Sequence, residues 1–361
     1  MKVLMISSDR NILNLNSSVR ERIKEYGDLV DELHIILMSD KKHSLVEDKI
    51  SSKVFVYPTN SMNKILRPFN ALQIGKRLNF DLITTQDPFE CGWVGMRLKR
   101  ARRIPLEVQL HTDMFSSQFN GVLNVIRKLI SRFVISYADS IRVVTESLGE
   151  EVKKRFNVNP EKITVLPIFV NRKNIDGETG FDLHDKYGFR TVILSVSRLE
   201  PEKDLELAIR VFADIFLDYP HTGFIIVGSG STEPHLKRLV KELGLEKNVV
   251  FVGWQDELVS YYKTADIYLQ TSVFEGYGLS LIEAGLNGLP VVTTPVGVAR
   301  DLDKVLIAQN KDIFVRNLEL LINDESKRRN IGEELKNELQ RTVLTKDLYM
   351  KSLRENWVKL C

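Results

Sequence analysis

The chain has 361 residues, of which 43% are hydrophobic and 27% charged, a composition that excludes a disordered protein. At about 150 residues per domain, this length predicts two domains. No apolar run approaches the ~18 residues of a membrane span, and the apolar start is too short for a secretory signal, so we expect neither. Cys91 and Cys361 form no CxxC motif or Cys/His cluster, which excludes a disulfide scaffold and a cysteine-based zinc site and favours a cytoplasmic location.

Short apolar runs alternate with segments of helical apolar spacing through the first half of the chain. The expected strands are residues 3–6, 33–37, 54–57, 82–84, 106–110, 141–144 and 163–166. The expected helices between them include residues 17–26, 71–78, 90–99 and 122–137. This alternation predicts a parallel sheet with helices on both faces.

A polar stretch within residues 167–180 interrupts the alternation and is predicted to be a linker. The pattern then restarts, with expected strands at 192–196, 223–227, 249–252, 267–269 and 291–293 and helices at 205–217, 233–243, 257–263 and 279–286. Residues 311–361 are almost entirely helical, and their first helix should pack on a core. The sequence therefore predicts two doubly wound α/β domains facing across a cleft, with ligands beyond the carboxyl ends of the strands.

The net charge of +3 is distributed unevenly along the chain. Residues 1–170 carry 26 basic and 19 acidic side chains, whereas residues 171–361 carry 25 and 29. A basic half can bind an anionic membrane or a phosphorylated ligand. An ordinary solvated surface explains the charge equally well.

The strongest motif is FEGYGLSLIEAGLNGLPVV, in which an expected strand and loop precede a helix. The glycines permit close approach of a ligand, and the free amides at the helix start suit an anion or sugar hydroxyls. The residues predicted to contact the ligand here are Gly276, Tyr277, Gly278, Leu279 and Ser280.

Two acids flank this turn. Glu283 lies on the apolar stripe of the helix, where a buried carboxylate needs hydrogen-bond donors. The hydroxyls of a ribose would supply them, and the alternatives are a buried arginine or a neighbouring backbone. Glu275 either contacts the ligand or is a solvated loop carboxylate. Their presence in one glycine-rich turn favours a ligand site.

Three further segments follow expected strands. In VILSVSRLEPEK, Arg198 and Lys203 suit a diphosphate, although an exposed turn has the same composition. His111 directly follows a strand, with Asp113 behind it, and is either a hydrogen-bonding group of the site or a structural histidine. The G-x-G of Gly228 and Gly230 is a weak dinucleotide fingerprint but an acceptable turn beside a nucleotide. We find no plausible metal-ligand set.

These motifs together resemble the retaining GT-B glycosyltransferases of family 4, most strongly between residues 191 and 297. The resemblance implies an N-terminal Rossmann-like acceptor-binding domain (residues 1–168) and a C-terminal Rossmann-like nucleotide-sugar-binding domain (residues 169–340). It also implies that a C-terminal helix (residues 341–361) packs back on the N-terminal domain. The loop at residues 7–18 departs from the family because it lacks a Gly-Gly pair, which leaves Asn16 as the candidate contact there.

The resemblance also implies the role of each residue. Arg198 and Lys203 would bind the diphosphate of a UDP- or GDP-sugar, Glu283 the ribose and Glu275 the sugar hydroxyls, with His111 beside the anomeric region. No metal or other cofactor would be needed. The implied reaction is front-face transfer with retention, in which the leaving phosphate takes the proton of the acceptor.

Basic side chains beside apolar ones in the first domain suggest a peripheral membrane face and a glycan or lipid-linked acceptor, as in cell-envelope polysaccharide or glycolipid synthesis. Ordinary solvated helices are the alternative. The competing functions are a GT-B nucleotide-sugar epimerase, a non-catalytic nucleotide-sugar binding protein and, less well supported, a nicotinamide-dependent oxidoreductase. Nucleic-acid binding is disfavoured because the basic clusters lack interleaved aromatic residues.

Overall fold

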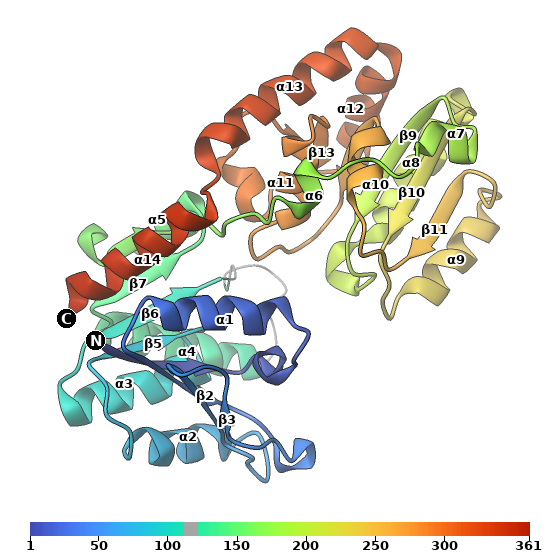
Figure 1. Cartoon of the computed structure of the whole chain (residues 1–361). Helices are drawn as coiled ribbons and strands as arrows, with labels where there is room; N and C mark the ends of the chain where they lie inside the picture. The colour runs from blue at the N-terminus through green and yellow to red at the C-terminus, as the bar shows by residue number, and fades with distance from the viewer. Residues whose placement is uncertain (112–113, 115–121) are drawn as a thin grey trace. The chain divides into compact units, whose positions relative to one another are not determined.

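The computed structural model describes residues 1–111, 114 and 122–361 and divides into two compact units. Unit 1 comprises residues 1–167 and 346–361, and unit 2 comprises residues 168–345. Each unit is built on its own sheet, with helices packed against it (Figure 1). The sequence prediction of two α/β domains is therefore confirmed.

Unit 1 contains an eight-stranded sheet of order β3-β4-β2-β1-β5-β6-β7-β8. All of its pairings are parallel except that of β3 with β4. The strands are β1 (Lys2–Ser7), β2 (Glu32–Leu37), β3 (Asp48–Lys49), β4 (Val54–Pro58), β5 (Leu82–Thr85), β6 (Leu106–Leu110), β7 (Ser140–Val143) and β8 (Ile163–Val165). The main helices between them are α1 (Ser18–Asp28), α2 (Arg67–Gly75), α3 (Glu90–Arg102), α4 (Val122–Tyr137) and α5 (Glu146–Phe156).

The last helix, α14 (Lys346–Leu360), belongs to unit 1, as the family resemblance implied. Tyr349, Leu353 and Trp357 recur every four residues and are all buried, so one face of α14 packs on this unit. The phenol oxygens of Tyr349 and Tyr26 lie 2.9 Å apart, and the Trp357 indole donates to Glu107 over 3.1 Å. The C-terminal helix thus completes the core of the first unit.

Unit 2 contains a fully parallel six-stranded sheet of order β11-β10-β9-β12-β13-β14. Its strands are β9 (Thr191–Val196), β10 (Thr222–Val227), β11 (Val249–Gly253), β12 (Ile267–Gln270), β13 (Val291–Thr293) and β14 (Leu306–Ile307). Its α-helices are α6 (Lys173–Asp176), α7 (Leu183–Tyr187), α8 (Leu205–Asp218), α9 (Glu233–Glu242), α10 (Val259–Thr264), α11 (Leu279–Leu286), α12 (Lys311–Asn323) and α13 (Glu325–Thr342).

The strand order places a topological switch point in each sheet. In unit 2 the chain runs from β9 outward to β11 and then returns to place β12 on the other side of β9. In unit 1 the chain likewise runs from β1 outward through β2 and β4 and then returns to place β5 on the other side of β1. Connections leave the two central strands in opposite directions, which opens a crevice at their carboxyl ends where ligands of such sheets bind.

One local feature differs from the sequence expectation, because the linker stretch contains the short helix α6. The helical C-terminal region consists of three helices, α12, α13 and α14. Asp324 ends α12 and accepts the Lys327 amide at 2.8 Å, so it caps α13 and separates the two helices. Phe314, Leu318 and Leu321 of α12 are buried in the core of unit 2, which confirms the expected packing.

Candidate functional site

Lys203 and Glu275 form a shielded ion pair at the switch point of unit 2. Lys203 ends the short 3-10 turn that follows β9, and Glu275 lies in the loop that follows β12. The Lys203 Nζ atom lies 2.7 Å from Glu275 Oε1, which also accepts the Ser272 hydroxyl at 2.8 Å. The Lys203 side chain is only 13% exposed and that of Glu275 11%. A cation and a carboxylate predicted from separate motifs therefore meet at one point.

The loops that carry this pair are tied together by backbone contacts. The Thr271 hydroxyl is within 3.2 Å of the Lys203 carbonyl and 2.9 Å of the Asp204 carbonyl. The Val273 amide donates to the Glu202 carbonyl at 2.9 Å. These bonds fix the position of Lys203 before any ligand binds, which is the preorganisation that charge stabilisation requires.

Two buried polar atoms beside Lys203 lack a hydrogen-bond partner. They are Ser197 Oγ, after β9, and Gln270 Oε1, at the end of β12. Both residues line one small cavity together with Lys203, Tyr268 and Ser272. An unsatisfied buried polar atom costs about 1–3 kcal/mol, so a ligand that bonded to these atoms would recover that free energy.

Arg198 does not join the shielded Lys203–Glu275 pair. Its side chain is 64% exposed, and its guanidinium bonds at 2.7 Å to Glu202, four residues further along the same loop. The sequence motif placed Arg198 and Lys203 together as two cations for a diphosphate, whereas in this structure only Lys203 lies beside Glu275.

Glu283 of α11 is part-buried and finds its hydrogen-bond donors within the protein. Oε1 accepts the Asn174 amide at 3.0 Å, and Oε2 accepts the Tyr262 hydroxyl at 3.1 Å. Burial raises the pKa of Glu283 above the usual carboxyl range, and these two bonds oppose the rise. The donors are thus neither a buried arginine nor a backbone amide.

The two motif acids act on the same tyrosine. Tyr268 of β12 is buried, and its hydroxyl donates to the Val196 carbonyl at 3.2 Å. Burial first, and then the negative charges of Glu275 and Glu283, raise the pKa of Tyr268, while a hydrogen bond with Ser280 lowers it. Both carboxylates therefore lie within electrostatic range of the strand end.

The glycine-rich turn has the geometry expected at the start of α11. Gly278 has a φ of +103°, and α11 begins without a side-chain cap, so its first amides remain available. Leu279 and Ser280 are the first residues of the helix. Tyr277 is instead buried, and its carbonyl accepts the Val298 amide at 2.8 Å. Its neighbour Gly276 completes the turn after Glu275.

Close backbone packing explains why residues 228 and 230 are glycines. A Cβ atom on Gly228 would lie 1.9 Å from the Ser197 carbonyl oxygen, and one on Gly230 would lie 2.3 Å from that of Leu199. The two glycines therefore let the β10 loop pack directly on the segment that carries Arg198. Their contribution to the site in this structure is to shape the loop after β9.

His111 follows β6 in unit 1 and ends a directional hydrogen-bond chain. Thr84 donates its hydroxyl proton to Glu107 at 2.7 Å and therefore accepts the Gln109 amide at 2.7 Å. The Gln109 Oε1 atom then faces His111 Nε2 at 2.8 Å. Because this oxygen can only accept, Nε2 carries the proton and Nδ1 is left as an acceptor.

The imidazole of His111 is neutral at ordinary pH. Burial, followed by the positive charges of Arg142 and Arg22, lowers the pKa of His111 to about 3. The residue can therefore accept a hydrogen bond from a hydroxyl, but it supplies no positive charge. Asn16 is exposed just before α1, and Asp113 lies outside the described residues.

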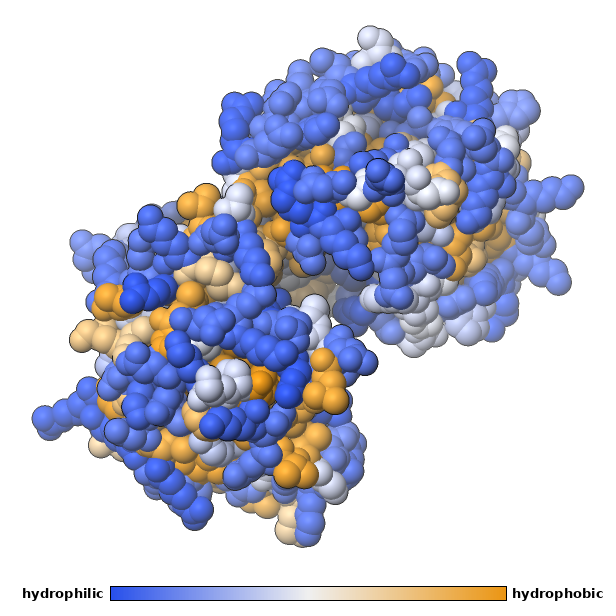
Figure 2. Space-filling view, in the orientation of Figure 1, coloured by the Kyte–Doolittle hydropathy of each residue, from blue (hydrophilic) through white to orange (hydrophobic). Residues whose placement is uncertain are grey.

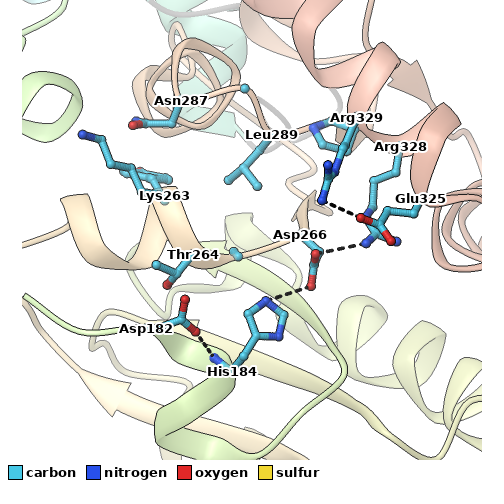
Figure 3. Close-up of a pocket in the computed structure, with 14 residues that line it drawn as sticks. Asp182, His184, Lys263, Thr264, Asp266, Asn287, Leu289, Glu325, Arg328 and Arg329 are labelled. Carbon is cyan, nitrogen blue, oxygen red and sulfur yellow. Dashed lines mark hydrogen bonds and ion pairs between the residues drawn. The ribbon is translucent and has the colours of Figure 1, made fainter. Parts of the chain in front are cut away.

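A second cavity in unit 2 lies at the opposite, amino end of its strands. It measures about 320 Å³ and is lined by residues just before β12 and β13 and on α13. The charged residues that line it contact one another (Figure 3). His184 and Arg328 both contact Asp266, and Arg329 pairs with Glu325. None of the predicted site residues lines it. Over the described residues, no group of three His, Cys, Asp or Glu side chains could hold a metal ion.

Two glycosyltransferase family models match this chain, one over most of each unit. The model described as "Glycosyl transferases group 1" matches residues 181–338, and "Glycosyltransferase Family 4" matches residues 16–174. The Anabaena protein HepE, solved with UDP and glucose, superimposes with a TM-score of 0.77 over 99% of this chain and 100% of that one at 18% identity.

Two curated relatives share more sequence. The alpha-monoglucosyldiacylglycerol synthase of Streptococcus pneumoniae is 28% identical over 62% of this chain and 53% of its own length. A Campylobacter jejuni N-acetylgalactosaminyltransferase, whose name specifies a diphospho-undecaprenol substrate, is 29% identical over 73% of this chain and 72% of its own. The chain spans 53–64% of the length of the first three relatives. The two family models and the shared architecture show that this chain belongs to the group 1 glycosyltransferases of GT-B fold.

Proposed function

We propose that this protein is a retaining glycosyltransferase that moves a sugar from a nucleotide-sugar donor to a glycan or lipid-linked acceptor in cell-envelope polysaccharide or glycolipid synthesis. The observation that carries the proposal is the shielded Lys203–Glu275 pair at the switch point of unit 2, beside the unpartnered Ser197 and Gln270 oxygens. A cation, an acid and free acceptor atoms at a strand-end crevice suit a phosphorylated sugar.

In this proposal, unit 2 binds a UDP- or GDP-sugar. Lys203 would hold the diphosphate, with Arg198 turning from Glu202 to join it, and Glu275 would accept sugar hydroxyls. Glu283 would bind the ribose in exchange for one of its present donors, Asn174 or Tyr262. The binding of UDP to HepE, which shares this fold, supports the choice of nucleotide.

The proposed reaction is a front-face substitution at the anomeric carbon. The bond from this carbon to the diphosphate oxygen breaks as the acceptor oxygen bonds on the same face, and the acceptor proton passes to the departing phosphate. Lys203 and the amides at the start of α11 would stabilise the charge that develops on the diphosphate, so we propose that no metal is required.

We also infer that helix α4 contacts an anionic membrane surface during transfer. Four exposed apolar residues, Val125, Ile126, Leu129 and Phe133, recur at helical spacing, and the basic Lys128 and Arg132 lie between them. Apolar surface also interrupts the hydrophilic surface of unit 1 in Figure 2. No described helix is long and apolar enough to cross a membrane. The lipids in the names of the two relatives, monoglucosyldiacylglycerol and a diphospho-undecaprenol, support a surface contact.

Substituting Glu283→Gln is expected to weaken UDP binding about 10- to 100-fold, because each hydrogen bond to a charged group contributes about 1.5–3 kcal/mol. The ribose hydroxyls bind the ionised carboxylate, so wild-type affinity should be highest above its raised pKa and should fall as pH decreases through it. The variant should lack this pH dependence. Titration calorimetry from pH 7.5 to 4.5 measures both effects, with the exposed Glu242→Gln on α9 as the matched control.

Incubation of the wild-type protein with UDP- and GDP-sugars separates the competing functions. A glycosyltransferase transfers the sugar to an acceptor, and proton NMR of the product should show the donor's anomeric configuration. Conversion of the sugar without an acceptor would identify an epimerase. Tight donor binding without turnover under any acceptor would identify a binding protein, and no binding of any nucleotide sugar would overturn the proposal.

The membrane contact is expected to require both the apolar stripe and the basic residues of α4. Replacing Leu129 and Phe133 by serine should abolish flotation with anionic liposomes, and high salt should weaken it. Leu217→Ser, on a leucine of α8 that is even more exposed than Leu129, is the matched control and should float as the wild type does. Absence of wild-type binding at low salt would contradict the inference.

A further inference from the structure

A cavity of about 380 Å³ lies at the carboxyl ends of β1 and β2 in unit 1. Ser8 follows β1, and Met38, Ser39 and Asp40 follow β2. It therefore occupies the same strand-end position, beside the switch point of its sheet, as the Lys203 site does in unit 2. The other lining residues come from the loops after β1 and β2, from the loop between β4 and α2, and from the start of α2. They are Arg10, Lys42, His43, Lys64 and Arg67.

Positive charge dominates this cavity. It is lined by four lysine or arginine side chains and one carboxylate, that of Asp40. Arg67 occupies both oxygens of this carboxylate, with Nε 2.7 Å from Oδ1 and Nη2 2.5 Å from Oδ2. This bond holds the pKa of Asp40 below its usual range, so the carboxylate is ionised and already neutralised by Arg67.

The other cations face the cavity without a balancing acid. Within the described part of the chain, no carboxylate lies within ion-pair distance of Arg10, Lys42 or Lys64. The Arg10 Nη1 atom instead lies 2.6 Å from His43 Nε2. Partial burial, and then the charges of Arg10 and Lys42, lower the pKa of His43, which indicates a locally positive potential. A bound anion would relieve this repulsion.

We propose that this cavity binds the phosphate or diphosphate group of the acceptor, with Arg10, Lys42 and Lys64 as its ligands. This inference rests on the proposed transfer to a lipid-linked acceptor. Guanidinium and ammonium groups around a strand-end crevice match the three or more anionic oxygens of such a group. His111 follows β6, which is two strands from β1 and three from β2, so roughly 10–15 Å separates His111 from the cavity along the sheet edge at ~5 Å per strand.

The surface beside the cavity suits a lipid chain. Met62, Ile65 and Leu66 are exposed and surround Lys64 in the sequence, immediately before α2. An exposed apolar segment next to a cationic cavity fits a ligand in which a phosphate is attached to a hydrocarbon. Neither a free sugar nor a soluble glycan would use both features.

The test measures anion binding by the full chain while the nucleotide site of unit 2 is filled. With saturating UDP present, inorganic pyrophosphate is titrated into the wild type, the double variant Lys42→Ala/Lys64→Ala and the control Lys154→Ala, an exposed lysine of α5. We expect wild type and control to bind alike and the double variant to bind about tenfold more weakly per lysine removed. Absence of wild-type pyrophosphate binding, or equal binding by the double variant, would overturn the proposal.

A second arm identifies the source of the phosphate. Polyprenyl diphosphate in detergent micelles should bind more tightly than pyrophosphate, and Ile65→Ser should remove only this advantage. Equal affinity for both ligands would overturn the lipid assignment. The Lys154→Ala control should retain wild-type UDP binding and sugar transfer from a UDP-sugar. If the wild type itself lacks both, the proposed function fails; if it has both but binds no pyrophosphate, only this cavity assignment fails.

Discussion

Replacing Lys203 by alanine is expected to lower kcat for sugar transfer about 10²- to 10³-fold, equivalent to ~3–4 kcal/mol of transition-state stabilisation. Lys203 is the shielded cation at the switch point of unit 2, and the structure fixes it there through Thr271 and Val273 before donor binds. The diphosphate of the bound donor is already negatively charged and gains a further charge as the glycosidic bond breaks, so KM should rise and the larger loss should appear in kcat. Steady-state kinetics with a UDP-sugar measures it.

The variant Arg198→Ala tests whether a second cation joins Lys203 when the donor binds. Arg198→Ala should also lower kcat, by a similar factor, if its guanidinium leaves Glu202 for the diphosphate. The matched control is Arg210→Ala, because Arg210 forms the same type of exposed pair, with Glu206 one helical turn away. An unchanged kcat in Arg198→Ala would show that the pair with Glu202 is only a surface ion pair. An unchanged kcat in Lys203→Ala would refute the donor-site assignment.

Glu107→Gln is expected to destabilise the protein by about 3–5 kcal/mol, because it leaves a buried arginine without its counter-charge. Glu107 is fully buried in β6, and Arg142 Nε of β7 lies 3.8 Å from its Oε1 atom. The same oxygen accepts the Thr84 hydroxyl and the Trp357 indole. Urea unfolding of the full chain, followed by tryptophan fluorescence, measures the change.

The control for Glu107 is Glu150→Gln on α5, which removes an exposed ion pair with Lys153 in the same unit. Such a pair contributes at most about 1 kcal/mol, so its unfolding midpoint should barely move. A Glu107 variant as stable as this control would show that Arg142 does not depend on the carboxylate.

The periodic pattern of apolar residues was sufficient to predict the fold. Every long strand of both sheets was predicted within one or two residues, because fully buried parallel strands read as short apolar runs. Strands β3 and β14 have only two residues each and carry no such run. Helix α6 has four residues, too few for a helical period, so the linker prediction missed it.

The motifs indicated which residues belong to the candidate site, but they did not predict every contact that these residues make. Lys203 and Glu275 follow neighbouring strands, and parallel topology alone brings such residues to one sheet edge. The partners of Glu283 were not predictable in this way. Asn174 lies in the unrecognised helix α6 and Tyr262 in α10, and tertiary packing alone brings them to the carboxylate. The cavity between Arg10 and Lys64 likewise depends on loops that are distant in sequence.

The discontinuity of unit 1 has a consequence for the order in which the chain folds as it is synthesised. Residues 1–167 leave the ribosome first, but Tyr26, Glu107 and Arg142 reach their final contacts only when Tyr349 and Trp357 arrive at the other end of the chain. Unit 2 is encoded without interruption and can complete its core earlier. Unit 1, whose main part is translated first, is therefore the last unit to complete its core. The hydrogen-bond chain that ends at His111 gains its contact from Trp357 to Glu107 only after translation passes residue 357.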